Sequence, residues 1–237
     1  MSEPVTRIAQ VYSDRVEVRG RDLTGDLMGR LTFTEYFHLL ATGREPTEDE
    51  RYFLDLLLVA IAEHGLMPTN VAARMTLAAD PDSLQGAVAA GILGAGPVVL
   101  GTAEECARLL EQTLADGTDP AEVAKGMRRV PGFGHPVHKP VDPRAERILS
   151  LADERGVSGE HVALARKFAE AVGLTMNVSM PIAAVLLDLG YPASFAKAVP
   201  ILARTASLLA HLAEEQQQPM GFDLARAAEE AAEYRND

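Results

Sequence analysis

Residues 131–148 read PGFGHPVHKPVDPRAERI, and this stretch carries more structural information than the rest of the chain. Its glycines and prolines restrict the backbone, and Pro143 directly after Asp142 is typical of the first position of a helix. His135, Lys139 and Arg144 lie close together on this loop and helix start. Imidazole, ammonium and guanidinium groups in such a cluster are suited to holding a small polycarboxylate beside a larger anionic ligand.

The composition indicates a soluble globular protein. With 237 residues, 47% of them apolar, the chain can bury a core as one large domain or two modest ones. It carries 22 Lys and Arg against 34 Asp and Glu, a net charge of -12, so no overall positive field favours nucleic acid or an anionic membrane. We therefore expect neither partner, and any anion must be held by a local cluster of positive charges.

The N-terminal residues and the single cysteine favour the cytoplasm. The first ten residues, MSEPVTRIAQ, lack the basic and apolar regions of a secretory signal. Cys106 has no second cysteine with which to form an intrachain disulfide. Apolar stretches such as residues 182–187 are much shorter than the roughly 20 residues that a membrane span requires.

Helical patterns dominate the rest of the chain, which predicts a mostly or wholly α-helical fold. The sequence at residues 5–18 is strand-like and predicts at most a short ribbon. Pro200 is expected to bend or interrupt its helix. The predicted helices cover residues 31–42, 51–64, 70–79, 82–93, 103–116, 143–155, 158–172, 180–189, 193–215 and 222–234, and a further one starts at residue 120.

Five segments in a fixed order give the chain a family resemblance. Residues 132–145 are similar to the GFGHxxxKxxDPRA motif of the citrate synthase and citryl-CoA lyase superfamily, and four further segments match other motifs of that superfamily. They are Arg19–Leu23 with the residues up to Thr47, Glu63–Gly65 with Ala72–Arg74, Gly94–Pro97, and Arg204–Ala206 with His211 and Glu214. The short chain resembles the citryl-CoA lyase-like branch most.

This resemblance implies an all-α, two-domain helical fold. A large domain would comprise residues 1–100 and 193–237, and a small domain, residues 101–192, would carry the loop with the motif. The cleft between them would close over substrate and exclude water. Family members pair through the large domain, so a homodimer is expected, with the small-residue helix at residues 83–96 suited to the contact.

The resemblance also implies which residues act on substrate. His135 and His64 would polarise the keto or hydroxyl oxygen of the substrate, and Arg144 and Arg204 would bind its carboxylates. Ser179 stands where the family has its catalytic aspartate, in the sequence Met176–Ser179. The predicted catalytic set is therefore His135, His64 and Ser179.

A coenzyme A thioester is the expected second substrate. The predicted contacts are Arg128, Arg129, Gly132, Phe133, Gly134 and Lys139. For the basic residues among them, ordinary solvation is the alternative interpretation. His138 is spaced so that it can also face the site. No metal or redox cofactor is expected, because the histidines lack paired-ligand spacing and no acidic cluster accompanies them.

The polar site residues also have structural interpretations. An unpaired charge inside an apolar helix is expensive, so Arg204 requires a carboxylate, which could belong to the substrate or to Asp188. Arg144 could instead form a surface ion pair with Asp142 or Glu146. His135 could bond to its own backbone. His64, at the end of the predicted helix 51–64, could interact with the C-terminus of that helix.

Three departures from the family pattern affect the chemistry. Serine has no carboxylate-like basicity, so Ser179 cannot replace the aspartate as a general base. Residues 98–100 are apolar where the family has a histidine, and residues 216–222 contain no arginine where full citrate synthases have one. The acetyl-activating half of the site is depleted, whereas the half that binds the keto acid is retained.

Three functions are compatible with this pattern. The first is cleavage or formation of a carbon–carbon bond between a CoA thioester enolate and a keto acid such as oxaloacetate, with activity altered by Ser179. A variant uses a malonyl-type thioester, because loss of carbon dioxide generates the enolate without proton abstraction. The second function is a catalytically silent protein that binds CoA or polycarboxylates as a sensor or accessory subunit, and the third is a purely structural helical dimer.

Overall fold

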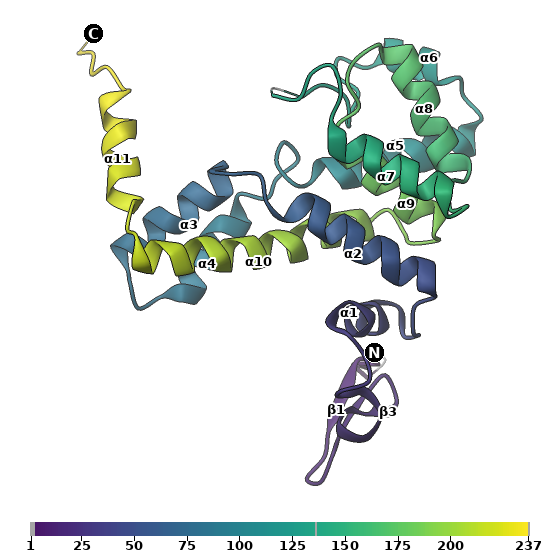
Figure 1. The fold of residues 1–237 in the computed structure, drawn as a ribbon, viewed down its shortest axis with the longest axis horizontal. Helices are drawn as coiled ribbons and strands as arrows, with labels where there is room; N and C mark the ends of the chain where they lie inside the picture. Colours follow the sequence, from purple (N-terminus) through teal and green to yellow (C-terminus); the bar gives the residue numbers. More distant parts are fainter. Residues whose placement is uncertain (1–2, 136, 237) are drawn as a thin grey trace. The chain divides into compact units, whose positions relative to one another are not determined.

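The computed structural model describes residues 3–135 and 137–236 and consists mainly of helices (Figure 1). The predicted all-α class is confirmed. The chain divides into two compact units, Met1–Leu56 and Leu57–Asp237, and the boundary falls within α2 (Glu48–Ala62). The division into domains at residues 100 and 193 stays a prediction.

The first unit contains the strand-like segment of the sequence. Strands β1 (Ala9–Val11), β2 (Val16–Val18) and β3 (Arg21–Asp22) form an antiparallel sheet in the order β1-β2-β3. A π-helical turn, η1 (Leu23–Leu27), and α1 (Phe33–Thr42) follow. The predicted short ribbon is therefore present.

A capping box starts α1, and a small apolar cluster supports the ribbon. The Thr32 hydroxyl accepts from the backbone N–H of Glu35, whose carboxylate accepts from the N–H of Thr32. Val18, Leu27 and Leu39 are buried together beside these elements. The unit thus has its own core.

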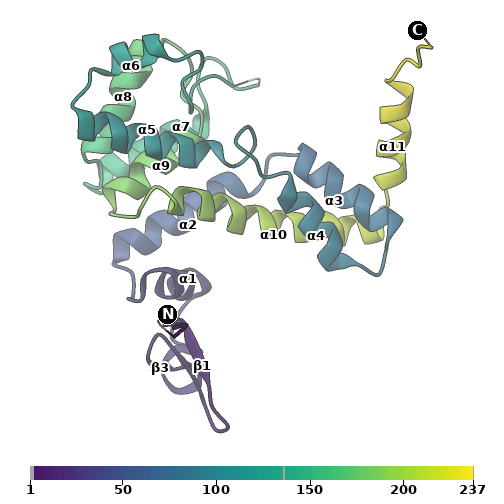
Figure 2. The same cartoon turned by 180° about the vertical axis from the view of Figure 1, so that it is seen from behind.

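The second unit contains most of the helices. Helices α3 (Pro68–Ala79), α4 (Leu84–Leu93) and α10 (Phe195–Gln217) contact one another, and α10 runs alongside the other two in both views (Figures 1 and 2). A second group packs around α9. The remaining helices are α5 (Thr102–Asp116), α6 (Pro120–Gly126), α7 (Pro143–Glu154), α8 (Glu160–Val172), α9 (Ser179–Asp188) and α11 (Gly221–Glu230).

Helix α9 is the centre of this second group. Every residue from Met180 to Leu187 is buried, and α9 contacts α5, α7 and α8. A helix that is apolar all round belongs in an interior, which explains the continuous apolar sequence at residues 180–187. Ser179 is the first residue of this helix and is therefore anchored to a buried element.

Two local predictions differ from the structure. Helix α10 continues through Pro200, so the proline does not interrupt it, and the predicted bend stays a prediction. Helix α2 ends at Ala62 and not at His64, so His64 lies on a loop. The carboxylate of Glu63 accepts the backbone N–H groups of His64 and Gly65 and holds that loop outside the helix. Within the described part of the chain, every helix is either too short or too polar to cross a bilayer.

Candidate active site

The PGFGH loop, residues 131–142, is attached to the segment that precedes α9. Phe133 and Met176 form an antiparallel β-bridge, and the backbone N–H of Gly134 donates to the carbonyl of Thr175 at 2.7 Å. The side-chain amide of Asn177 donates to the carbonyl of Gly134 at 3.0 Å. Two stretches about forty residues apart therefore form one small β element that fixes the loop.

A cavity of about 530 Å³ lies beside this element. Its polar lining contains most of the residues predicted to bind or transform substrate: His64, Arg129, His135, Arg144, Ser179 and Arg204. Apolar side chains complete the wall, among them Val98, Val99 and Leu100, in the stretch where the family histidine is missing. Among the described lining residues there is no carboxylate, so the cavity is suited to an anionic ligand.

His135 bonds to its own backbone, as one of its two interpretations predicted. Its Nδ1 accepts from the backbone N–H of Val137 at 3.1 Å and from that of His138 at 2.9 Å. A neutral imidazole has one donor and one acceptor, so the proton of His135 is on Nε2. That Nε2 lies 3.3 Å from Nε2 of His64, which must then be the acceptor. His135 thus donates to His64 in the free protein, and both residues line the cavity.

Three imidazoles gather here, which raises the question of a metal. Potential ligand atoms of His64, His135 and His138 all lie within 4.8 Å of one another, and the rings of His135 and His138 are 4.4 Å apart. A metal-bound histidine normally donates its second N–H to an acceptor. His135 shows the opposite polarity, because its second nitrogen accepts two backbone N–H groups. The donor set therefore does not favour a three-histidine metal site.

Burial keeps both cavity histidines neutral. The pKa of His64 is lowered from its ordinary value of 6.5, first by burial and then by the positive charge of Arg144. The pKa of His135 is lowered by burial and by His138. A bound polycarboxylate would oppose both shifts, since an adjacent negative charge favours imidazolium.

Arg204 is buried and forms no ion pair with the described residues. Its side chain is 2% exposed, Nη1 donates to Oδ1 of Asn70 at 3.3 Å, and Nη2 donates to the carbonyl of Ile61 at 3.4 Å. Nε has no hydrogen-bond acceptor among the described residues. Burial lowers the pKa of Arg204. Because a buried guanidinium needs a counter-charge, this arrangement points to a carboxylate supplied by a ligand.

Asp188 is not the partner of Arg204. Its carboxylate accepts the backbone N–H groups of Gly159, His161 and Val162 at the start of α8, at 2.7–3.0 Å. Its Oδ1 also lies 2.8 Å from Nδ1 of His161. The interpretation that Asp188 neutralises Arg204 is wrong, because that carboxylate caps another helix.

Arg144 forms the predicted ion pair with Asp142 and also lines the cavity. It forms an ion pair with Asp142, which is fully buried, and its own side chain remains 20% exposed where it lines the cavity. Asp142 also accepts the backbone N–H of Val178 at 3.2 Å. The pair therefore orients the guanidinium and connects it to the start of α9.

Ser179 occupies the position predicted for the missing base. It is the first residue of α9 and lines the cavity. Its backbone N–H donates to Oδ1 of Asn177 at 3.1 Å, and its hydroxyl makes no hydrogen bond to the described residues. Sequence reasoning missed Asn177 and Asn70, which hold the loop and Arg204; a polar residue directly before or after a site segment is the signal that could have found them.

The residues predicted to bind coenzyme A are divided among several places. Gly134 and Lys139 line a neighbouring cavity of about 820 Å³ that shares His135 with the first one. Gly132 and Phe133 are buried within the β element, and Arg128 is exposed but lines neither cavity. The structure brings Gly134 and Lys139 together and separates Arg128 from them.

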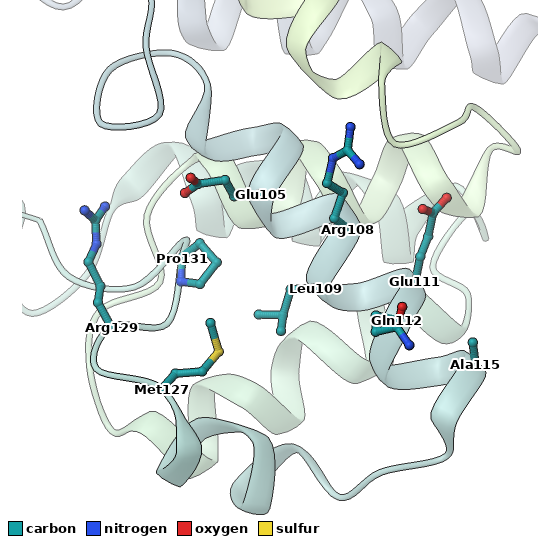
Figure 3. Close-up of a pocket in the computed structure, with 9 residues that line it drawn as sticks. All are labelled: Glu105, Arg108, Leu109, Glu111, Gln112, Ala115, Met127, Arg129 and Pro131. Carbon is teal, nitrogen blue, oxygen red and sulfur yellow. The ribbon is translucent and has the colours of Figure 1, made fainter.

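Arg129 connects the first cavity with an open groove of about 870 Å³ on α5 (Figure 3). In that groove the side chains of Leu109, Met127 and Pro131 converge, whereas Arg108 points away from them (Figure 3). A single guanidinium therefore lines both the cavity and the groove.

Comparisons with known proteins show which family this chain belongs to. Residues 5–227 match the family described as citrate synthase, C-terminal domain. The chain is 28% identical over 223 residues to citrate synthase of Saccharolobus solfataricus, covering 86% of this chain and 58% of that protein. It therefore spans less than two thirds of the length of this curated relative.

Solved structures extend the likeness over the whole chain. A citryl-CoA lyase from Hydrogenobacter thermophilus superposes with a TM-score of 0.90 at 30% identity, covering 100% of this chain and 96% of that one. ATP citrate lyase from Methanothrix soehngenii, in complex with citrate and coenzyme A, shares the fold with a TM-score of 0.82 at 19% identity, over 100% of this chain and 42% of that one. Because the family match extends from residue 5 to residue 227, this chain belongs to the citrate synthase family, as its motifs predicted.

Proposed function

We propose that this protein makes or breaks the carbon–carbon bond between a CoA thioester enolate and a keto acid such as oxaloacetate. The observation that carries the proposal is Arg204, a buried guanidinium without a carboxylate partner among the described residues, in a cavity that His64, His135 and Arg144 also line. A dicarboxylate would supply the missing counter-charge and accept the hydrogen bonds that these groups can donate.

The tautomers suggest separate roles for the two histidines. In the cleavage direction, the hydroxyl of a citryl thioester would displace the contact between the two rings, and its proton would pass to Nε2 of His64. The Nε2–H of His135 would donate to the same oxygen as it becomes a carbonyl. The bond to the thioester carbon breaks, and the resulting enolate takes a proton from water. In synthesis the same steps run in reverse.

The absence of a carboxylate from the described cavity lining favours a second candidate, decarboxylative condensation. A malonyl-type thioester forms its enolate by losing carbon dioxide, so no residue need abstract a proton. Ser179 and the apolar Val98 and Val99 would surround the reacting group, and an apolar wall destabilises the carboxylate that is lost.

A paired assay tests the proposal. The wild-type protein, Ser179→Asp and a Ser179→Ala control would be incubated with citryl-CoA, with acetyl-CoA plus oxaloacetate, and with malonyl-CoA plus oxaloacetate. We expect Ser179→Asp to raise the acetyl-CoA reaction by on the order of a hundredfold, since it restores a general base. Turnover of malonyl-CoA by the wild type, without turnover of citryl-CoA or acetyl-CoA, would select the decarboxylative reaction.

Binding without turnover in all three variants would instead identify a silent sensor or accessory subunit. An absence of both turnover and ligand-induced thermal shift, with oxaloacetate and with CoA esters, would contradict the proposal. It would favour a structural role.

The proposal includes a homodimer. The family resemblance supports it, and Leu93, on the small-residue stretch expected to pair, is 86% exposed. Sedimentation equilibrium would test it, and a monomer at all concentrations would contradict it.

A further inference from the structure

The carboxylate of Glu63 lies directly before His64 and outside the lining of the cavity. Its Oε1 accepts two consecutive backbone N–H groups, from His64 at 2.8 Å and from Gly65 at 2.6 Å. Two bonds from one loop to one oxygen determine the course of the backbone at His64. They therefore fix the backbone position from which the His64 side chain extends.

The other oxygen of Glu63 is held by α10. Oε2 accepts a short hydrogen bond from the hydroxyl of Ser207 and lies 3.1 Å from Nε2 of His211. Ser207 and His211 come three and seven residues after Arg204, so the three side chains share one face of the helix. One carboxylate thus joins the loop of His64 to the helix face that carries Arg204.

A buried cation fixes the proton positions in this network. Arg74 is fully buried and donates from Nε, at 3.2 Å, and from Nη2, at 2.9 Å, to Nδ1 of His211. Because a guanidinium has no acceptor, Nδ1 must hold the lone pair and Nε2 must carry the proton that His211 donates to Glu63. The charge of Arg74 is balanced by Glu214 and Glu215.

Glu63 remains charged throughout the ordinary pH range. Burial alone would raise its pKa, but the bonds from Ser207, His211 and the two backbone amides outweigh burial and lower the pKa to about 2. Its negative charge also opposes the burial that lowers the pKa of Arg204.

We propose that Glu63 is a positioning residue, which fixes the imidazole of His64 relative to the guanidinium of Arg204 so that both groups can reach one polycarboxylate. Its side chain is 51% exposed and lines no part of the cavity, so it acts through His64 and not on substrate. The inference rests on the proposed function only for the identity of the ligand. The placement of the loop is a property of the free protein.

The test compares Glu63→Gln with a matched control, Glu214→Gln. The side-chain amide of this variant has one oxygen that accepts and one NH2 group that donates. The NH2 group must therefore face either the two backbone N–H groups or the N–H of His211, where it cannot accept a hydrogen bond. We expect the Kd for oxaloacetate to rise about tenfold in Glu63→Gln, the loss typical of a hydrogen bond to a charged group. Glu214 pairs with Arg74 and makes no hydrogen bond or ion pair with the His64 loop among the described residues. Its variant should therefore bind oxaloacetate normally.

A second readout does not depend on ligand. The amide and imidazole NMR resonances of His64 in the free protein should shift in Glu63→Gln and stay in place in Glu214→Gln. Ser207→Ala, which keeps the charge and removes one hydroxyl, should shift them less, and it serves if Glu63→Gln fails to fold.

Unchanged resonances together with unchanged affinity in Glu63→Gln would overturn the inference. If the wild type itself does not bind oxaloacetate, the proposed function fails. The resonances of the free variants then still decide whether Glu63 positions His64.

Discussion

Arg144 meets Asp142 at two points: its Nε lies 3.0 Å from one carboxylate oxygen and its Nη2 lies 2.8 Å from the other. Asp142 is fully buried, and it also accepts the backbone N–H groups of Arg144 and Val178. A paired contact of this kind fixes the plane of the guanidinium. Arg144 is therefore pre-oriented at the cavity before any ligand arrives.

Removing the charge of Asp142 should damage both stability and binding. We expect Asp142→Asn to lower the free energy of unfolding by about 3 kcal/mol, because it leaves a partly buried cation without its partner. The comparison is Asp153→Asn, which breaks an exposed pair with Arg166 and should cost less than about 1 kcal/mol. Denaturant unfolding measures both, and equal losses would contradict the role of Asp142.

Replacing Arg204 should separate stability from function. An apolar side chain of similar length, as in Arg204→Met, removes a buried charge that no carboxylate among the described residues neutralises. The free energy of unfolding without ligand should stay the same or rise by about 1–2 kcal/mol. Oxaloacetate should no longer raise the melting temperature. A large loss of stability would show that Arg204 has a structural partner.

The cavity histidines predict a particular pH dependence. The pKa values of His64 and His135 are lowered below 6.5 in the folded protein. As the pH falls below 6.5, the unfolded chain therefore binds more protons than the folded one, and stability decreases. Glu63, with a pKa of about 2, contributes stability that is lost only from about pH 4.5 downward.

Unfolding measured between neutral pH and pH 5 checks this dependence, with a double His64→Gln and His135→Gln variant as the control. The decrease should be smaller in the double variant. Oxaloacetate binding, followed by calorimetry in two buffers of different ionisation enthalpy, should show proton uptake. Proton release would contradict the predicted shifts.

Two glycines of the PGFGH loop should respond differently to alanine. Both Gly132 and Gly134 have a φ of +83°, but a Cβ on Gly132 would lie 2.8 Å from Sγ of Cys106 and from Cβ of Met180, whereas none would crowd Gly134. Gly134→Ala should cost about 1 kcal/mol of backbone strain. Gly132→Ala should cost about 1–3 kcal/mol more, through overpacking. Thermal unfolding compares the two, and similar losses would be inconsistent with the packing around Gly132.

The sequence predicted the helical fold because helices depend on local patterns. Apolar spacing gives the helices, and the compact loop motif brings His135 and Arg144 together within ten residues. The distant partners His64 and Arg204 could be assigned only through the family resemblance. Their convergence depends on how α2, α3 and α10 pack.

Other features could not be predicted because they are decided by backbone contacts. Helix α2 ends early because the backbone N–H groups of His64 and Gly65 donate to the carboxylate of Glu63 and not to carbonyls of the helix. The alternative that Asp188 pairs with Arg204 was wrong, since the sequence position of Asp188 shows only that it ends α9 and not that it faces the start of α8. The tautomer of His135 depends on two amides that no sequence motif reveals.

The β-bridge between Phe133 and Met176 has a practical consequence for protein engineering. A graft that transferred the PGFGH loop alone to another scaffold would leave its backbone groups without the strand on which they depend. Both stretches would have to be transplanted together, and Asp142 and Arg144, which lie between them, would have to be kept with them.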